Sequence, residues 1–149
     1  MGTGQAFVAT EPGAARATTS GARIRPIHVD QADRFLRRIG VAAPDPLDFA
    51  LGAHQDDATL IGVAALGITV KNRARAVVAV APERRRLRVG TDLAHDLVTE
   101  AARLDIRNLW FRYPISAAAD ALVRSIGLIA ARRVANGEVT ATFLLTDRP

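Results

Sequence analysis

Hydrophobic and polar residues alternate along this chain with two different periods, and each change of period marks a new strand or helix. Residues 22–29 alternate between apolar and polar side chains, which predicts a half-buried strand. Residues 30–40 place their apolar side chains on one helical face, with Asp30 as the predicted N-cap and Gly40 as the stop signal. The domain is therefore expected to begin with a strand and a helix.

Three more strands are predicted to follow. The apolar runs 47–54 and 58–70 flank a short polar turn, which indicates a hairpin. Residues 75–81 are apolar at nearly every position, as expected of a strand that is covered on both faces.

The longest predicted helix covers residues 89–106. Its apolar side chains repeat at helical spacing, whereas Asp92 and Asp96 are predicted to face solvent. The expected buried face comprises Leu93, Leu97, Val98, Ala101 and Leu104.

The remainder of the chain predicts one strand, one short helix and a final hairpin, each marked by its own start or turn signal. These elements are a strand at 108–113, a helix from the N-cap Ser116 to Gly127, and strands at 128–134 and 138–145 joined by Asn136-Gly137.

Taken in order, the predicted elements read β-α-β-β-β-α-β-α-β-β. This order is typical of an α+β domain with a mixed, mostly antiparallel sheet flanked by helices and one β-α-β crossover. Residues 1–21 are rich in Gly, Ala and Thr and lack a hydrophobic period. We therefore expect a flexible N-terminal tail at 1–21 and a single folded domain over 22–149.

The composition excludes several kinds of site. The chain has no Cys, which removes thiolate nucleophiles and Cys-ligated metals, and its three His lack metal-ligand spacing. No metal is therefore expected. No apolar run is long enough to span a bilayer, and no secretory signal is visible, so we expect a cytoplasmic protein without a membrane partner.

The charge balance is basic, with a formal net charge of +5. A nucleic-acid binder that uses the arginine run at 84–88 together with Arg73 and Arg75 is therefore one hypothesis. The chain has few aromatic residues and no known nucleic-acid-binding motif, so nucleic acid is not favoured as a partner.

Residues 85–90 (RRLRVG), 116–128 (SAAADALVRSIGL) and 58–66 (ATLIGVAAL) stand at the loop before the long helix, in the short helix and in the second hairpin strand. All three resemble motifs of the GNAT superfamily, the acyl-CoA-dependent N-acyltransferases. Residues 85–90 resemble the family pattern Q/R-x-x-G-x-G/A, with Arg88 in place of the first glycine. Residues 116–128 (SAAADALVRSIGL) resemble N-x-x-A-x-x-L-Y-x-x-x-G-F, with Val123 in place of the tyrosine, and 58–66 (ATLIGVAAL) match more weakly. The resemblance implies a GNAT-like fold in which the crossover forms the CoA site.

The first of these motifs also has a physical meaning of its own. A tight loop that runs into a helix leaves backbone N–H groups without partners, and the helix dipole adds positive charge there, so the loop suits a pyrophosphate. The resemblance implies that acetyl-CoA or another acyl-CoA binds here as co-substrate. Its pantetheine arm is expected along Val78, Ala79 and Val80, and its pyrophosphate on Arg85, Arg86, Leu87, Arg88, Val89, Gly90 and Thr91.

The expected catalytic groups match the family less well. Many members carry a glutamate base on the strand that corresponds to 75–81, where this chain has no carboxylate, and a tyrosine acid where this chain has Val123. Tyr113 is the candidate replacement acid, and core packing is the alternative interpretation. His54 and Asp56, near the tip of the predicted hairpin, are candidate contacts for the acceptor, and a solvated turn is the alternative.

The sequence thus favours an N-acetyltransferase that moves an acyl group from acetyl-CoA directly to an amine, either a small molecule or a protein. The main alternative is a non-catalytic acyl-CoA-binding or interaction domain, because the base and acid positions are lost. A homodimer formed through an edge strand near 138–145 is a further hypothesis.

Overall fold

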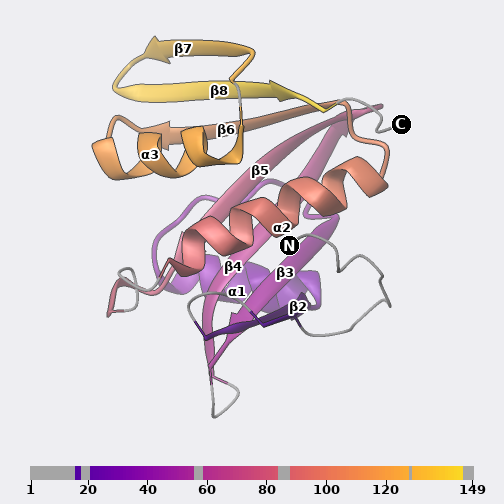
Figure 1. Cartoon of the computed structure of the whole chain (residues 1–149), viewed down its shortest axis with the longest axis vertical. Coiled ribbons are helices and arrows are strands. Elements are labelled where there is room, and N and C mark those ends of the chain that lie inside the picture. Colours follow the sequence, from indigo (N-terminus) through magenta and orange to yellow (C-terminus); the bar gives the residue numbers. More distant parts are fainter. Residues whose placement is uncertain (1–15, 18–20, 56–58, 84–87, 128, 146–149) are drawn as a thin grey trace.

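In the computed structural model, the described residues form one eight-stranded sheet with one helix on one face and two helices on the other (Figure 1). The structure describes residues 16–17, 21–55, 59–83, 88–127 and 129–145. In chain order the elements are β1 (Arg16–Ala17), β2 (Arg23–Pro26), α1 (Val29–Arg38), β3 (Phe49–His54), β4 (Leu60–Val70), β5 (Arg73–Val80), α2 (Val89–Arg103), β6 (Asn108–Pro114), α3 (Ala117–Ile126), β7 (Ala131–Ala135) and β8 (Glu138–Leu144).

The sheet confirms the predicted α+β class. Its strand order is β1-β2-β3-β4-β5-β6-β8-β7, and every neighbouring pair is antiparallel except β5 and β6. That one parallel pair is joined through α2, which is the predicted β-α-β crossover. Strand β1 lies within the segment that was expected to be a flexible tail and pairs with β2.

The helix caps follow the sequence signals in one case and depart from them in another. Ser116 caps α3 as predicted, because its Oγ accepts the Ala119 N–H at 3.2 Å. The prediction of Asp30 as the N-cap of α1 is wrong. His28 takes that place in an extended conformation, and its Nδ1 accepts the Asp30 N–H at 3.1 Å.

Helix α2 buries more of its surface than its pattern predicted. Asp92 and Asp96 were expected to face solvent, but each is only 8% exposed and makes polar interactions. The reason is that α2 packs against β3, β4 and β5 on one side and against α3 on another. Leu104, predicted to be buried, lies just beyond the last turn and is 45% exposed.

The sheet has a core on each face. Between the sheet and α2, buried leucines pack with Phe111 and Phe143, whose rings meet edge to face at 5.9 Å between centroids. Between the sheet and α1, Phe35 and Leu36 pack on small residues of β3 and β4. Strand β5 contributes to both cores, as expected of a strand covered on both faces, with Ala76 and Val80 on the α2 side and Ala79 on the α1 side. Arg75 and Val77 are only half-buried.

The far edge of the sheet also differs from expectation. Strand β8, expected to lie at or near an edge, is interior because it pairs with β6 on one side and β7 on the other. Strand β7 is the edge, and all five of its residues are exposed.

Candidate functional site

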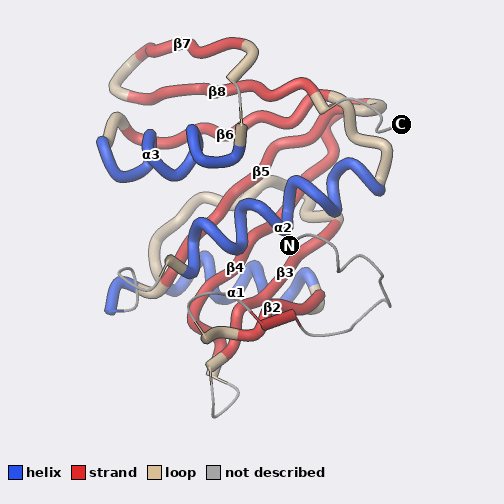
Figure 2. The backbone as a smooth tube through the Cα atoms, viewed as in Figure 1, coloured by secondary structure: helices blue, strands red, loops and turns tan. Residues whose placement is uncertain are grey.

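The parallel strands β5 and β6 stay together for only part of their length. They pair from Arg73 with Asn108 to Ala76 with Phe111. Beyond that point β5 remains paired with β4 up to Val80, while β6 pairs with β8 up to Pro114. The two strands therefore diverge, and Figure 2 shows them spreading apart toward the side where α3 lies. We call the segments 77–80 and 112–114 the strand separation.

The N-terminus of α2 lies beside the diverging end of β5. Its N-cap is Arg88, which has φ 63° and ψ 15° and forms no side-chain capping hydrogen bond. A left-handed residue followed by helical residues turns successive backbone N–H groups toward the same side, which creates an anion-binding concavity. Arg88 thus adopts a positive φ at the position where the GNAT pattern has a glycine.

Gly90 brings three elements together at this point. A Cβ atom on Gly90 would lie 2.9 Å from Leu122 Cδ1 on α3 and 3.5 Å from Val80 Cγ2 on β5. A side chain on Gly90 would therefore displace Leu122 of α3, while Val80 of β5 lies at ordinary van der Waals distance. This close approach fixes the start of α2 against the strand separation.

The predicted cofactor residues divide into two groups. The structure places Val78, Ala79 and Val80 on β5 along the strand separation, and Arg88, Val89, Gly90 and Thr91 at the start of α2. Arg85, Arg86 and Leu87, predicted to contact the pyrophosphate, lie outside the described residues, as does Asp56.

His54 is buried at the end of β3. It is 7% exposed, and its Nδ1 has no hydrogen-bond partner among the described residues. Burial, with a smaller contribution from the charge of Arg25, holds the pKa of His54 below its usual value, so the ring is neutral at pH 7. Strand β4 separates β3 from β5, so His54 lies two strands away from the strand separation.

Tyr113 belongs to a polar group that joins β6, α3 and β7. Its hydroxyl donates to Asp120 Oδ1 at 2.6 Å, and Arg132 donates to Asp120 Oδ2 at 3.2 Å. Burial and the hydrogen bond to Asp120 raise the pKa of Tyr113, and that same hydrogen bond lowers the pKa of Asp120. Sequence reasoning missed Asp120 and Arg132, since only the fold brings them to Tyr113.

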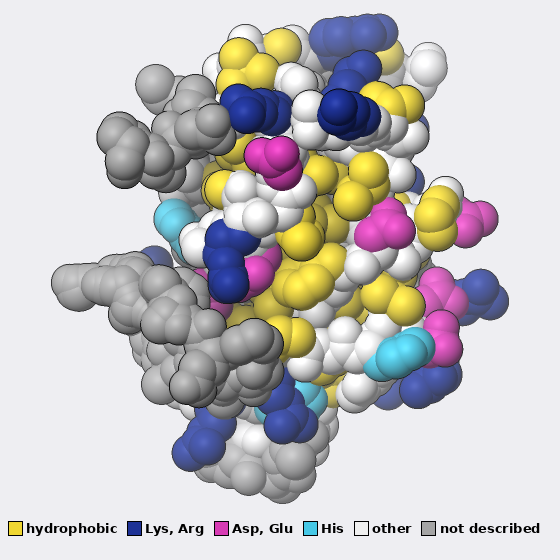
Figure 3. All heavy atoms as spheres, turned by 90° about the vertical axis from the view of Figure 1, so that its right-hand side faces the viewer, with side chains coloured by type: hydrophobic (Ala, Val, Ile, Leu, Met, Phe, Trp, Pro, Cys, Tyr) yellow, Lys and Arg dark blue, Asp and Glu magenta, His cyan; other side chains and the backbone are white. Residues whose placement is uncertain are grey.

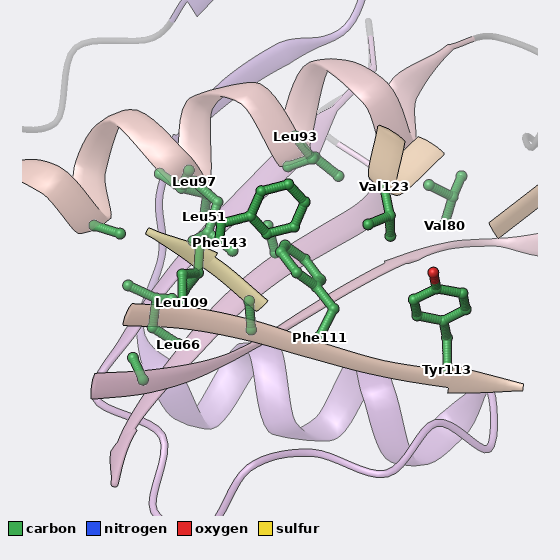
Figure 4. Close-up of a cluster of buried hydrophobic side chains, with 14 of the residues drawn as sticks. Leu51, Leu66, Val80, Leu93, Leu97, Leu109, Phe111, Tyr113, Val123 and Phe143 are labelled. Carbon is green, nitrogen blue, oxygen red and sulfur yellow. The ribbon is translucent and has the colours of Figure 1, made fainter. Parts of the chain in front are cut away.

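Val123 is a core residue and not an exposed wall of the strand separation. It is 3% exposed and belongs to the core between the sheet, α2 and α3. Figure 4 shows its side chain near Val80, with the Tyr113 hydroxyl directed toward the same region. The tyrosine expected from the family motif is therefore replaced by tight apolar packing, and the nearest phenol comes from β6.

No group of three or more His, Cys, Asp or Glu residues in the described part of the chain could hold a metal ion. No helix that the structure describes is long and apolar enough to cross a bilayer.

Comparison with known proteins gave matches to structures but not to sequences. No family model matches the chain, and no curated protein matches it. The GNAT domain of PAT from S. lividans has a TM-score of 0.67 at 17% identity, over 89% of this chain and 96% of that chain.

Two other solved structures give similar values. An IAA acetyltransferase from Bacillus cereus has a TM-score of 0.64 at 18% identity, over 83% of this chain and 99% of that chain. An acetyltransferase from Bacillus subtilis in complex with CoA has a TM-score of 0.63 at 17% identity, over 84% of this chain and 99% of that chain. The chain therefore has the fold of the GNAT acetyltransferases.

Proposed function

We propose that this protein is an acyl-CoA-dependent N-acyltransferase that transfers an acyl group from acetyl-CoA, or a related acyl-CoA, directly to an amine. The observation that carries the proposal is the divergence of β5 and β6 next to the N-terminus of α2. The shared fold adds support, because one of the similar structures holds CoA.

In the proposed reaction, the neutral amine nitrogen attacks the thioester carbonyl carbon. The carbon–sulfur bond then breaks, CoA leaves as a thiolate, and the proton of the amine passes to water. Backbone N–H groups at the start of α2 hold the pyrophosphate, and β5 lines the pantetheine arm. The proposed contacts are Val78, Ala79, Val80, Arg85, Arg86, Leu87, Arg88, Val89, Gly90 and Thr91.

The described residues supply no obvious base for this reaction. Strand β5 carries no carboxylate, and His54 lies two strands away. The acceptor therefore loses its proton to water before attack. Because an alkyl amine has a pKa of about 10.4, its neutral fraction rises about tenfold for each pH unit below that value.

Tyr113 is poorly suited to protonate the leaving thiolate. Its proton is already donated to Asp120, and its pKa is raised above the usual value of 10.0. A CoA thiol resembles Cys, with a pKa of about 8.5, so the transfer would be uphill. The thiolate leaves unprotonated in our proposal, and Tyr113→Phe is expected to change kcat by less than about threefold.

A non-catalytic acyl-CoA-binding domain is the second candidate. The burial of Val123 and the lack of a carboxylate on β5 favour it, since neither position that many family members use for proton transfer carries a titratable group. Such a domain keeps the start of α2 and the strand separation but releases no CoA from an acyl-CoA.

A thermal-shift screen with CoA, acetyl-CoA and longer acyl-CoAs tests the proposal. A ligand at 100 times its Kd stabilises the fold by about 2.7 kcal/mol. Gly90→Val is the matched variant, because its branched side chain crowds Leu122 and occupies space at the start of α2 beside Val80, and we expect about a 100-fold loss of affinity. Binding without CoA release from any amine supports the second candidate, and no shift with any acyl-CoA rejects both.

A further inference from the structure

The face of the sheet opposite α2 and α3 carries a row of basic and aromatic side chains. Side chains alternate between the two faces of a strand, and Ala76 and Phe111 belong to the core beside α2. Arg75, Trp110 and Arg112 therefore lie on the other face. In the register of the sheet, Arg75 is directly opposite Trp110.

The two guanidinium groups lie over the same indole ring. The Cζ atom of Arg75 is 5.8 Å from the centroid of Trp110, and that of Arg112 is 5.3 Å away. Two like charges around one ring repel each other, and the charge of Arg112 is one of the causes that lower the pKa of Arg75, after burial. A bound anion would relieve that repulsion.

Among the described residues, no carboxylate lies within ion-pair distance of these two arginines, although the charge of Glu138 favours the charged form of Arg75. Neither forms an ion pair there, and the buried Nε of Arg75 has no hydrogen-bond acceptor. Within strands β5 to β8 the one acidic residue is Glu138, which is exposed. Guanidinium groups without a carboxylate partner are available for an anionic ligand.

The same face carries polar and basic residues further along the sheet. Arg112 and Arg133 both pair with Thr140 in register, so they flank it on either side, and Thr142 pairs with Trp110. Figure 3 views the molecule from the right-hand side of Figure 1, and basic side chains also lie near the top of that view, at the level of β6, β8 and β7. The row continues across β5, β6, β8 and β7, whereas α1, the described helix on this side of the sheet, packs mainly on β3 and β4.

The row lies at the point where the strand separation begins. Arg75 precedes Ala76 and Arg112 follows Phe111, the last pair that joins β5 to β6. With a rise of about 3.3 Å per residue, both arginines are within one residue of that point along the strands. A second reactant that approached from this face would reach the strand separation from the side opposite α2.

We propose that Arg75, Trp110 and Arg112 bind a carboxylate of the acceptor, so that the acceptor is an amine that also carries a carboxylate. This inference rests on the proposed function. The planar guanidinium fork matches a carboxylate with two parallel hydrogen bonds, and the indole fixes the plane of the guanidinium beside it.

A small acid fits this face better than a single-stranded nucleic acid. Binding of successive bases uses several aromatic platforms, and Trp110 is the one aromatic residue on this face of β5, β6, β7 and β8. Phe111, Tyr113 and Phe143 belong to the core on the other side. The row therefore offers one anion site beside one ring.

The fluorescence of Trp110 tests the site directly, because Trp110 is the single tryptophan of the chain. Glutarate, a probe with carboxylates and no amine, is titrated at constant ionic strength. We expect a saturable change in emission, and Arg75→Gln and Arg112→Gln are each expected to weaken binding about 10- to 100-fold, the range for hydrogen bonds to a charged group. Glu138→Gln is expected to strengthen glutarate binding, because it removes a negative charge from the same group of strands.

Arg34→Gln is the matched control. Arg34 is an exposed arginine on α1, away from the row, so its loss changes the net charge by the same amount without touching the site. Arg112 is exposed, so Arg112→Gln is expected to fold normally. It therefore tests the site even if Arg75→Gln does not fold. No saturable change with glutarate, or an equal effect of Arg34→Gln, would overturn the proposal. Tighter quenching by a thymidine oligonucleotide would also overturn it in favour of nucleic acid.

Acyl transfer then separates this inference from the proposed function. γ-Aminobutyrate and butylamine are compared as acceptors with acetyl-CoA, since both carry a primary alkyl amine and one also carries a carboxylate. We expect kcat/KM to favour γ-aminobutyrate at least about tenfold in the wild type, and Arg112→Gln to remove the preference. Equal transfer to both acceptors keeps the proposed function and overturns the carboxylate site. Saturable glutarate binding by a protein that does not bind acyl-CoA overturns the function and the acceptor role together.

Discussion

Strands β5 and β6 present two chemically different faces from alternating residues of the same segments. Toward α2 they show Ala74, Ala76, Leu109 and Phe111, each at most 4% exposed. Toward the other side they show arginines around a tryptophan. The apolar face is required by packing, whereas packing does not require the basic face. Packing therefore accounts for the first face, and the carboxylate site proposed above would account for the second.

Core truncation gives the largest expected difference between the faces. Phe111→Ala removes a ring that packs on Phe143 and is expected to lower the free energy of unfolding by about 3–5 kcal/mol. Arg112→Ala, at the next residue, is expected to cost less than about 1 kcal/mol. Urea denaturation followed by circular dichroism measures both, and similar losses would show that the second face is also structural.

The pH dependence of acyl transfer tests whether a side chain on either face acts as a general base for the acceptor amine. We expect kcat/KM to rise about tenfold per pH unit up to at least about pH 9, because the amine must be neutral. Tyr113 cannot produce a rise below pH 9, since its raised pKa keeps the phenol protonated there. A plateau near pH 7 in initial rates would reveal a base in the site, or an acceptor with a less basic amine.

Replacing Val123 by the tyrosine of the family motif tests the role of this position on the apolar face. Because Val123 is 3% exposed, Val123→Tyr overpacks the core and is expected to cost about 1–3 kcal/mol of unfolding free energy. Val123→Ile is the control for added volume without a phenol. A stable Val123→Tyr variant with higher kcat would contradict the assignment of Val123 to the core.

The smallest expected effect is at the N-cap of α2. Arg88→Gly is expected to stabilise the protein by up to about 1 kcal/mol, because glycine adopts φ 63° without the steric cost paid by arginine. Arg88→Ala removes the same side chain without relieving the backbone, so thermal denaturation should separate the two variants. Equal melting temperatures would show that the positive φ costs nothing here.

Much of the fold was predictable because its local signals agree with one another. Ser116 and the Asn136-Gly137 turn lie where the sequence put them, with positive φ at both turn residues. The burial of Asp92 and Asp96 was not predictable, since a single helix pattern does not show that a second helix covers its flank.

The candidate site was predictable only where it is built from residues that are close together in the sequence. The motif at 85–90 locates the start of α2, because a loop entering a helix is a local feature. The pairing of Arg75 with Trp110 is set by the parallel register of β5 and β6, and the Tyr113–Asp120 bond by the docking of α3. Hydrophobic periodicity does not specify which residues of distant strands lie side by side.

Amide hydrogen exchange of the protein with and without CoA tests the central claim most directly, because it locates the ligand residue by residue. We expect CoA to slow exchange at 77–80 on β5 and at 88–91 at the start of α2, and to leave β7 unchanged. Gly90→Val, checked for folding by circular dichroism, should lose this protection. CoA that binds while 77–80 and 88–91 exchange as before would contradict the claim that the strand separation and the N-terminus of α2 form the acyl-CoA site.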